Sequence, residues 1–245
     1  MAHEPVTIHT ADGDCPTHVL TPEGTGPWPA VIFYMDGLAI RPTLVEMAAR
    51  LAGHGYVVLL PDMFYRFGPY APLVPKEVFA TDYRPIIGPM MATTDNHKAA
   101  EDTAAFLAYL DSRDDVAGTK IGTVGFCMGG GMALTVAGTY PDRVAAAASF
   151  HGGNLATDTP LSPHLLAPKI TAEVYVAGAD NDHGYPPEMA ARLDQALSDA
   201  GVRHVCEIYP GAAHGWMKPD FPVYDEAAAE HGWGEMLALF ARNLK

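Results

Sequence analysis

A short glycine-rich segment between a strand and a helix places the strongest constraint on how this chain folds. Residues 125–130 read GFCMGG; they follow the apolar run 121–124 and precede an Ala- and Gly-rich stretch, 131–140, that we predict to be helical. A G-x-C-x-G sequence in this position is typical of a tight strand-to-helix turn, whose flanking positions need residues without a Cβ. Such a turn lifts the Cys127 side chain above the sheet edge, at a helix N-terminus that favours a thiolate. Cys127 is therefore a candidate nucleophile, and a buried structural cysteine is the less favoured reading.

Two further polar residues follow predicted strands. The run 172–177 leads into Asp180, and a later run, 204–209, leads into His214. Because the carboxyl ends of parallel strands meet at one edge of a sheet, we expect both side chains to lie near Cys127. The sequence therefore predicts a catalytic group of one cysteine, one carboxylate and one histidine.

The triad acid has two candidates in one loop. Asp180 comes directly after the Gly-Ala turn that ends the predicted strand, and Asp182 follows two residues later. We predict Asp180 as the acid that orients His214, with Asp182 as the alternative. In that assignment Asp182 caps the helix that begins near Pro186.

The whole chain alternates strands with helices, which predicts an α/β fold with a mostly parallel sheet covered by helices on both faces. An antiparallel hairpin is expected at the start, from residues 6–9 and 17–20. No linker or internal repeat divides the chain, so we expect a single domain over residues 1–245. Residues 61–91 break the alternation with six prolines and several aromatic residues. Long loops of this kind are often functional, which favours a substrate-binding cap over a plain connector.

These features together resemble the dienelactone hydrolase family, within the α/β-hydrolase fold. The resemblance covers most of the chain and rests on the run GYVVLLPDMFYR at 55–66, on GFCMGG, on the GAD that ends at Asp180, and on AHGW around His214. It implies hydrolysis of a lactone or small ester through a thioester acyl-enzyme. Carried over, Cys127 is the nucleophile, His214 the base and later the acid, and Asp180 the residue that orients the imidazole.

Hydrolysis of an ester also needs donors for the oxyanion. The backbone N–H of Met128 is one expected donor, and Gly37, after the predicted strand 30–35, is the other. The family has a glutamate beside this loop, close to the thiol, whereas this chain has the shorter Asp36. The shorter acid is expected to alter the resting ionisation of Cys127.

Several residues are candidates for contact with substrate. Dienelactone hydrolases hold a substrate carboxylate with arginines, but here Lys218 stands four residues after His214, and an ammonium is a poorer bidentate partner than a guanidinium. This departure and the aromatic insert favour a neutral ester or lactone over a carboxylated dienelactone. The full set of predicted substrate-binding residues is Asp36, Tyr65, Arg66, Arg84, His151, Trp216 and Lys218, with Arg41 as a further candidate cation.

Composition excludes several other classes of protein. The formal net charge of −14 argues against nucleic acid and anionic membranes as partners. No signal peptide and no membrane span is predicted. Three cysteines, Cys15, Cys127 and Cys206, form an odd and sparse set that favours the cytoplasm, and we expect Cys15 and Cys206 to be packing residues. We expect a monomer or homodimer.

The motifs predict neither a cofactor nor a metal. Despite 11 histidines, the sequence has no HExxH or CxxC spacing, and the glycine run lacks the pattern of a dinucleotide site. Two alternatives to the lactone or ester hydrolase stay open. One is a thioesterase or acyl transferase with the same triad, and the other is a non-catalytic protein that senses or binds through its thiol.

Overall fold

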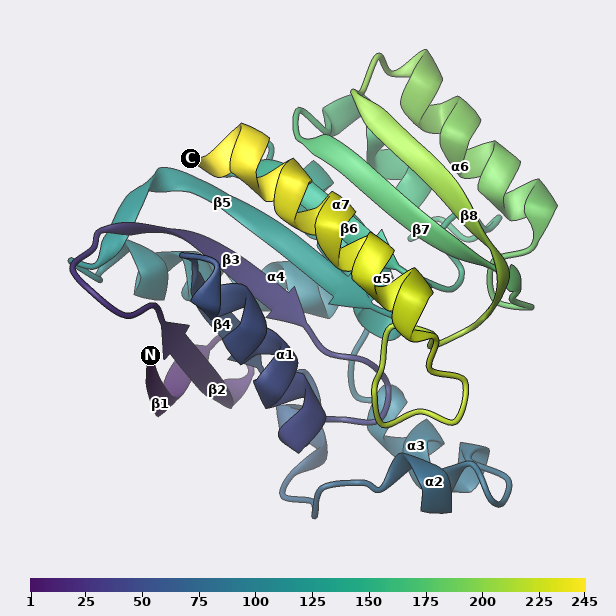
Figure 1. Ribbon diagram of the computed structural model, residues 1–245, viewed down its shortest axis with the longest axis horizontal. Coiled ribbons are helices and arrows are strands. Elements are labelled where there is room, and N and C mark those ends of the chain that lie inside the picture. The colour runs from purple at the N-terminus through teal and green to yellow at the C-terminus, as the bar shows by residue number, and fades with distance from the viewer.

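A single eight-stranded sheet forms the centre of the protein, in a computed structural model that describes residues 1–245 (Figure 1). The strands lie in the order β1-β2-β4-β3-β5-β6-β7-β8. The first two are antiparallel, and β3 to β8 run parallel to one another. Their bounds are β1 Ala2–Thr10, β2 Gly13–Thr21, β3 Trp28–Tyr34, β4 Val57–Pro61, β5 Val116–Phe126, β6 Val144–Phe150, β7 Glu173–Asn181 and β8 His204–Ala213. The predicted α/β architecture and the opening hairpin are confirmed.

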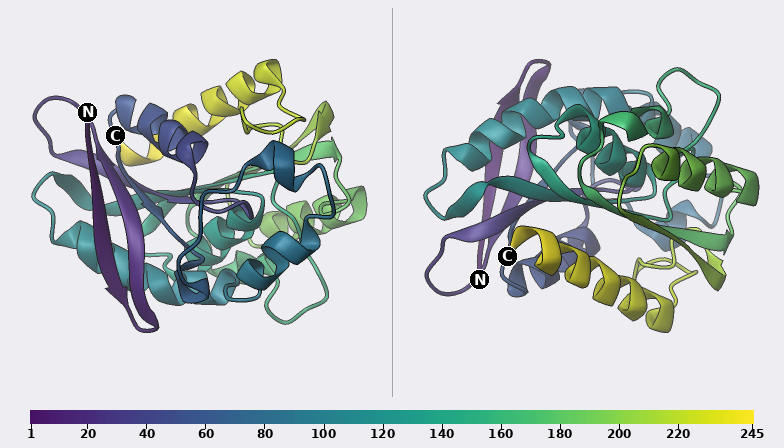
Figure 2. Two further views of the ribbon diagram at one scale, coloured as in Figure 1. Left: turned by 90° about the horizontal axis from the view of Figure 1, so that it is seen from below. Right: turned by 90° about the horizontal axis from the view of Figure 1, so that it is seen from above.

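Helices cover both faces of the sheet, as the two views of Figure 2 show. The helices α1 (Pro42–Gly53) and α7 (Glu226–Leu244) lie on one face. The opposite face carries α4 (Asn96–Asp111), α5 (Met128–Thr139) and α6 (Pro187–Asp199), with the short helix η2 (Pro163–Lys169) beside α5. Parallel strands buried on both faces read as continuous apolar runs, which is why β4 is buried at every position.

The helix ends follow their local sequence. Asp95 caps α4 by accepting hydrogen bonds from the backbone N–H groups of His97 and Lys98, each at 2.8 Å. Pro42 occupies the first position of α1, where a missing N–H costs nothing. Asp225 caps α7 through the N–H of Ala228. These caps fix where each helix begins relative to the sheet.

The insert after β4 lies beyond the carboxyl end of the sheet, beside the segment that follows β8 (Figure 1). It contains three short helices, η1 (Tyr65–Phe67), α2 (Pro75–Val78) and α3 (Arg84–Met91). The loops after β3, β5, β7 and β8 open at the same edge, because parallel strands end on one side. Segments far apart in the chain therefore meet there. No helix of the protein has both the length and the apolar composition needed to cross a membrane.

Candidate active site

The turn between β5 and α5 holds Cys127 in a strained conformation. Its backbone has φ 54° and ψ −116°, in the left-handed half of the map that few residues with a side chain adopt. A Cβ at Gly125 would lie 1.8 Å from the carbonyl oxygen of Gly129, and one at Gly129 would lie 2.4 Å from that of Tyr34. Both flanking glycines are thus required by close backbone contacts. The predicted elbow is present, and the thiol is partly exposed at the N-terminus of α5.

His214 links this thiol to a carboxylate. Its Nδ1 lies 2.7 Å from Oδ2 of Asp182, so Nδ1–H donates to the acid, and the ring also hydrogen-bonds the Cys127 side chain. Burial by itself lowers the pKa of His214, but the Cys127 charge and the hydrogen bonds to Asp182 and Cys127 outweigh it and raise the pKa to about 10. The contacts of His214 therefore favour its imidazolium form.

The partner of His214 is Asp182 and not Asp180, which corrects our expectation from the sequence. The strand β7 extends to Asn181, beyond the predicted end at residue 177, so Asp180 belongs to the strand and the loop begins at Asp182. The exposed Asp180 carboxylate accepts instead from the N–H of Gly211 at 3.2 Å.

The buried Asp182 carboxylate uses both of its oxygens. Oδ1 accepts from the N–H of Gly184 at 2.8 Å, which leaves Oδ2 for His214. The spacing Asp-x-Gly in residues 182–184, typical of such a side-chain turn, was the available sequence signal for this position.

The loop after β3 is held by a buried ion cluster. Asp36, 1% exposed, forms a bidentate pair with Arg41 at 2.8 and 2.9 Å and lies 3.6 Å from Nζ of Lys218. Burial would raise the pKa of Asp36, but the cations Lys218 and Arg41 outweigh it and hold the pKa below its ordinary value. Oδ1 of Asp36 also accepts from the N–H of Leu38 at 2.9 Å. The cluster thereby fixes the turn that carries Gly37.

Lys218 has no access to the cavity that contains Cys127. Its side chain is fully buried, and Nζ lies 3.6 Å from the centre of the Phe126 ring. Burial lowers the pKa of Lys218 to about 7, with Asp36 opposing the shift and Arg41 adding to it. Arg41 is equally buried and pairs with Asp36 and Asp220. Neither cation is placed to bind a substrate carboxylate.

His151 and Trp216 do not line the cavity, although His151 contacts both Cys127 and His214. His151 has φ 40° and is fully buried, and its Nδ1 accepts from the N–H of Cys127 at 3.1 Å. Burial, followed by the neighbouring His214 and Lys218, lowers the pKa of His151 well below 6.5, so it stays neutral. Trp216 is buried against the rings of His151 and Tyr209. These two residues support the elbow and the His214 loop.

The remaining candidates lie elsewhere. Tyr65 and Arg66, from η1, both bind the buried carboxylate of Asp102. Arg84 is exposed and pairs with Asp82, two residues earlier. The structure does not bring Tyr65, Arg66 or Arg84 to Cys127, because each is already committed to an acid from its own neighbourhood.

A cavity of about 460 Å³ opens over Cys127. Half of its lining residues are apolar, and neither lysine nor arginine is among them. The lining consists of Asp36, Gly37, Leu38, Phe79, Tyr83, Ile87, Met91, Cys127, Asn181, Asp182, His183, Gly184, His214 and Phe221. Four of these residues come from the insert 61–91. The sequence indicated the insert as a whole but not Ile87 or Met91 within it, nor Phe221 later in the chain. Nothing in the sequence distinguishes an apolar residue that lines a cavity from one that packs in the core.

The comparison with known sequences assigns a family. The profile of the dienelactone hydrolase family matches residues 15–244. A protein of Synechocystis sp. designated carboxymethylenebutenolidase is 28% identical over 243 residues, covering 98% of this chain and 96% of its own. A protein of Bradyrhizobium sp. designated 2-oxo-3-(5-oxofuran-2-ylidene)propanoate lactonase is 26% identical over 224 residues, covering 90% of this chain and 86% of its own.

Solved structures agree on the fold. A dienelactone hydrolase from Klebsiella pneumoniae superposes with a TM-score of 0.86 at 23% identity, covering 98% of both chains. A dienelactone hydrolase-like promiscuous phosphotriesterase from metagenomic libraries gives 0.77 at 23% identity, with both chains fully covered. With the family profile matched along nearly the whole chain, the protein belongs to the dienelactone hydrolase family and is a hydrolase of that class.

Proposed function

We propose that this enzyme hydrolyses small uncharged lactones or esters through a Cys127–His214–Asp182 triad and a thioester acyl-enzyme. The observation that carries the proposal is the position of His214, hydrogen-bonded to Cys127 on one side and to Asp182 on the other. This arrangement supplies a nucleophile, a proton carrier and an orienting acid within one chain of contacts. The partly exposed thiol faces a cavity large enough for a small ester.

In the first half-reaction the Cys127 thiolate attacks the carbonyl carbon, and a C–S bond forms as the carbonyl oxygen takes the negative charge. The N–H groups of Met128 and Gly37 are the proposed donors to that oxyanion. Met128 is the first residue of α5, so its N–H has no acceptor within the helix, and Gly37 lines the cavity beside Cys127. When the carbonyl re-forms, the C–O bond breaks and the leaving alkoxide takes the proton of His214.

In the second half-reaction water attacks the thioester carbon. His214, now neutral, accepts a proton from the water, and the C–S bond breaks to release the acid and restore the thiolate. Asp182 holds the ring with Nδ1 protonated in both steps, so the other nitrogen is the one that exchanges protons. In a lactone the leaving alkoxide stays attached to the acyl group, and the product is a hydroxy acid.

The cavity lining favours uncharged substrates. Its charged side chains are the acids Asp36 and Asp182 and the His214 imidazolium, which is already paired with Asp182. The cations Arg41 and Lys218 are buried behind the cavity. A carboxylate placed among these groups would lose water without gaining a cation that is free of an acid partner, which is unfavourable. The names of the relatives denote carboxylated lactones, so we propose a different substrate preference for this chain. In this proposal the insert 61–91 acts as a cap that shapes an apolar site.

The test compares wild type with Cys127→Ala on p-nitrophenyl acetate, a neutral lactone and a carboxylated dienelactone. We expect turnover to vanish in Cys127→Ala, and kcat/KM for the neutral lactone to exceed that for the carboxylated one at least tenfold. Mass spectrometry of wild type quenched during turnover should find the acetyl group on the peptide that contains Cys127. Unchanged turnover in Cys127→Ala would refute the mechanism, and a preference for the carboxylated lactone would refute the substrate class. An acyl thioester in the same panel tests the thioesterase alternative.

A further inference from the structure

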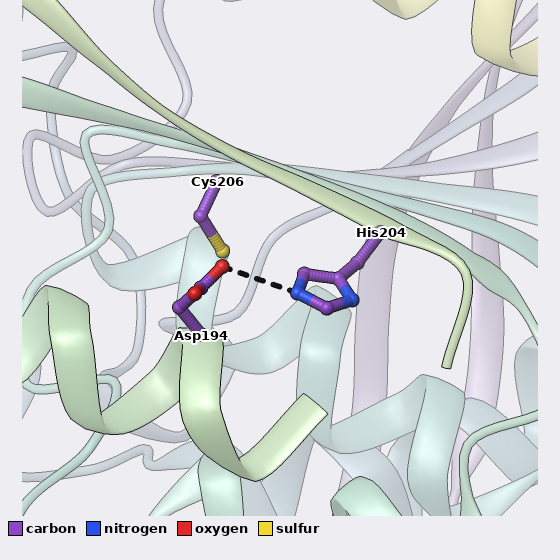
Figure 3. A group of neighbouring side chains, drawn as sticks. All are labelled: Asp194, His204 and Cys206. Carbon is purple, nitrogen blue, oxygen red and sulfur yellow. Dashed lines mark hydrogen bonds and ion pairs between the residues drawn. The ribbon is translucent and has the colours of Figure 1, made fainter. Parts of the chain in front are cut away.

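A second group of cysteine, histidine and aspartate lies at the outer edge of the sheet (Figure 3). His204 and Cys206 are two residues apart on β8 and point to the same side, toward Asp194 of α6. One potential ligand atom from each residue lies within 4.8 Å of the other two. His204 and His214 stand at opposite ends of β8, about 30 Å apart at the rise of an extended strand. This group is therefore separate from the active site.

The hydrogen bonds of His204 fix its tautomer. Nδ1 lies 2.7 Å from the carbonyl oxygen of Val202, which can only accept, so Nδ1 carries the proton. In the neutral ring Nε2 is then an acceptor, yet it faces Oδ1 of Asp194 at 3.1 Å. Two acceptors directed at each other are unfavourable unless a proton or a metal cation lies between them. A histidine that donates Nδ1–H to a carbonyl and directs Nε2 outward has the arrangement of a metal ligand.

Cys206 supplies the third donor atom. The Cys206 side chain hydrogen-bonds the Asp194 carboxylate, so its sulfur lies directly beside the other two potential ligand atoms. A divalent cation bound here would displace the thiol proton, because a coordinating thiol is deprotonated.

We propose that His204, Cys206 and Asp194 form a Zn²⁺ site that ties α6 to the edge strand β8. One nitrogen, one sulfur and one oxygen donor suit Zn²⁺, with water as the fourth ligand of a tetrahedron. The Asp194 side chain is 55% exposed, so the ion reaches the site from solvent. The sequence shows no metal spacing because the third ligand comes from the preceding helix, and the proposed site differs from our expectation of no metal. The proposal is independent of the proposed hydrolase mechanism.

Co²⁺ is the spectroscopic probe for this test, because tetrahedral cobalt with a thiolate ligand gives visible bands and a near-ultraviolet charge-transfer band. The parent protein for every titration is Cys127→Ala, since the active-site thiol and His214 offer a competing cobalt site. We expect one equivalent of Co²⁺ to produce both features, and Zn²⁺ to displace it. Zn²⁺ is also expected to raise the Tm of this protein, because the ion binds the folded state.

Each ligand has its own variant in that background. Cys206→Ser should abolish the charge-transfer band, and His204→Ala should weaken binding at least about 100-fold. The matched control is His231→Ala. His231 pairs with Glu207 of β8 at 3.0 Å, but no thiol belongs to that pair. The cobalt spectrum of this variant should equal that of the parent. Far-UV circular dichroism without metal verifies that each variant is folded. No thiolate band in the parent, or a band that survives Cys206→Ser, would overturn the proposal.

Discussion

Replacement of Asp182 by asparagine separates the two candidate acids of the triad. Asp182 accepts two hydrogen bonds, one on each oxygen, from the N–H of Gly184 and from Nδ1–H of His214. An asparagine has one acceptor oxygen, so it can serve only one of these donors. If the oxygen stays with Gly184, the amide NH₂ faces His214 and drives the imidazole proton to the other nitrogen. The ring then cannot accept a proton from the thiol.

The size of the effect follows from the bond that is lost. A hydrogen bond to a charged group contributes about 1.5–3 kcal/mol, and about 1.4 kcal/mol in the barrier is a factor of ten in rate. We therefore expect Asp182→Asn to lower kcat/KM about 10- to 150-fold. Asp180→Asn is the matched control, because the Asp180 carboxylate is exposed and accepts only from Gly211. A change within about threefold is expected for that surface substitution.

The assay measures kcat/KM for p-nitrophenyl acetate in wild type and both variants at one pH, with thermal unfolding to verify folding. A larger loss in Asp180→Asn than in Asp182→Asn would refute the assignment. Equal and small losses in both variants would show that no carboxylate in this loop orients His214.

The structure also predicts how hydrolysis depends on pH, and how the free energy of unfolding depends on Gly125 and Arg41. Because its neighbours raise the pKa of His214 to about 10, the imidazolium persists until the pH rises through that value. We therefore expect kcat/KM for an alkyl ester to fall as the pH rises through about 10. A fall centred at about 6.5, the ordinary pKa of histidine, would contradict the contacts of His214 with Cys127 and Asp182. Gly125→Ala should cost about 3 kcal/mol or more in urea unfolding, because its Cβ would lie 1.8 Å from the Gly129 carbonyl oxygen; a cost under about 1 kcal/mol would contradict the turn geometry. Arg41→Met should cost about 3–5 kcal/mol by the same measurement, because it removes the bidentate partner of the buried Asp36; unchanged stability would show that the pair is not needed for folding.

The sequence was sufficient to predict those features of the site that depend only on neighbouring residues. The turn at Cys127 could be predicted because three consecutive constraints, an apolar strand, flanking glycines and a helix, coincide within a few residues. His214 was found for a similar reason, since it follows a strand directly. The choice between Asp180 and Asp182 could not be made from neighbouring residues. It depends on how far β7 stays paired with β8, and that pairing extends to Asn181 opposite Ala213.

The partners of the charged residues were even harder to predict from the sequence than the acid that pairs with His214. Arg66, Arg84 and Lys218 were plausible substrate contacts as isolated cations, but each is bound to an acid, namely Asp102, Asp82 and Asp36 respectively. The Arg66–Asp102 and Lys218–Asp36 pairs join residues distant in the chain and leave no periodic pattern, so the sequence cannot show that these two cations are already neutralised.

By itself, the sequence determined the α/β class, the family resemblance, the position of the elbow thiol and the candidate histidine. Strand and helix periodicity and the need for glycine in a tight turn depend on residues that are neighbours in the chain. Only the tertiary structure decided which aspartate meets His214, which cations are removed from the cavity and that His204, Cys206 and Asp194 converge. Each of those outcomes depends on the register of strands and on the packing of helices against them, which brings together atoms from separate segments. The physical reason is that side-chain electrostatics act through space, whereas the sequence records only order along the chain.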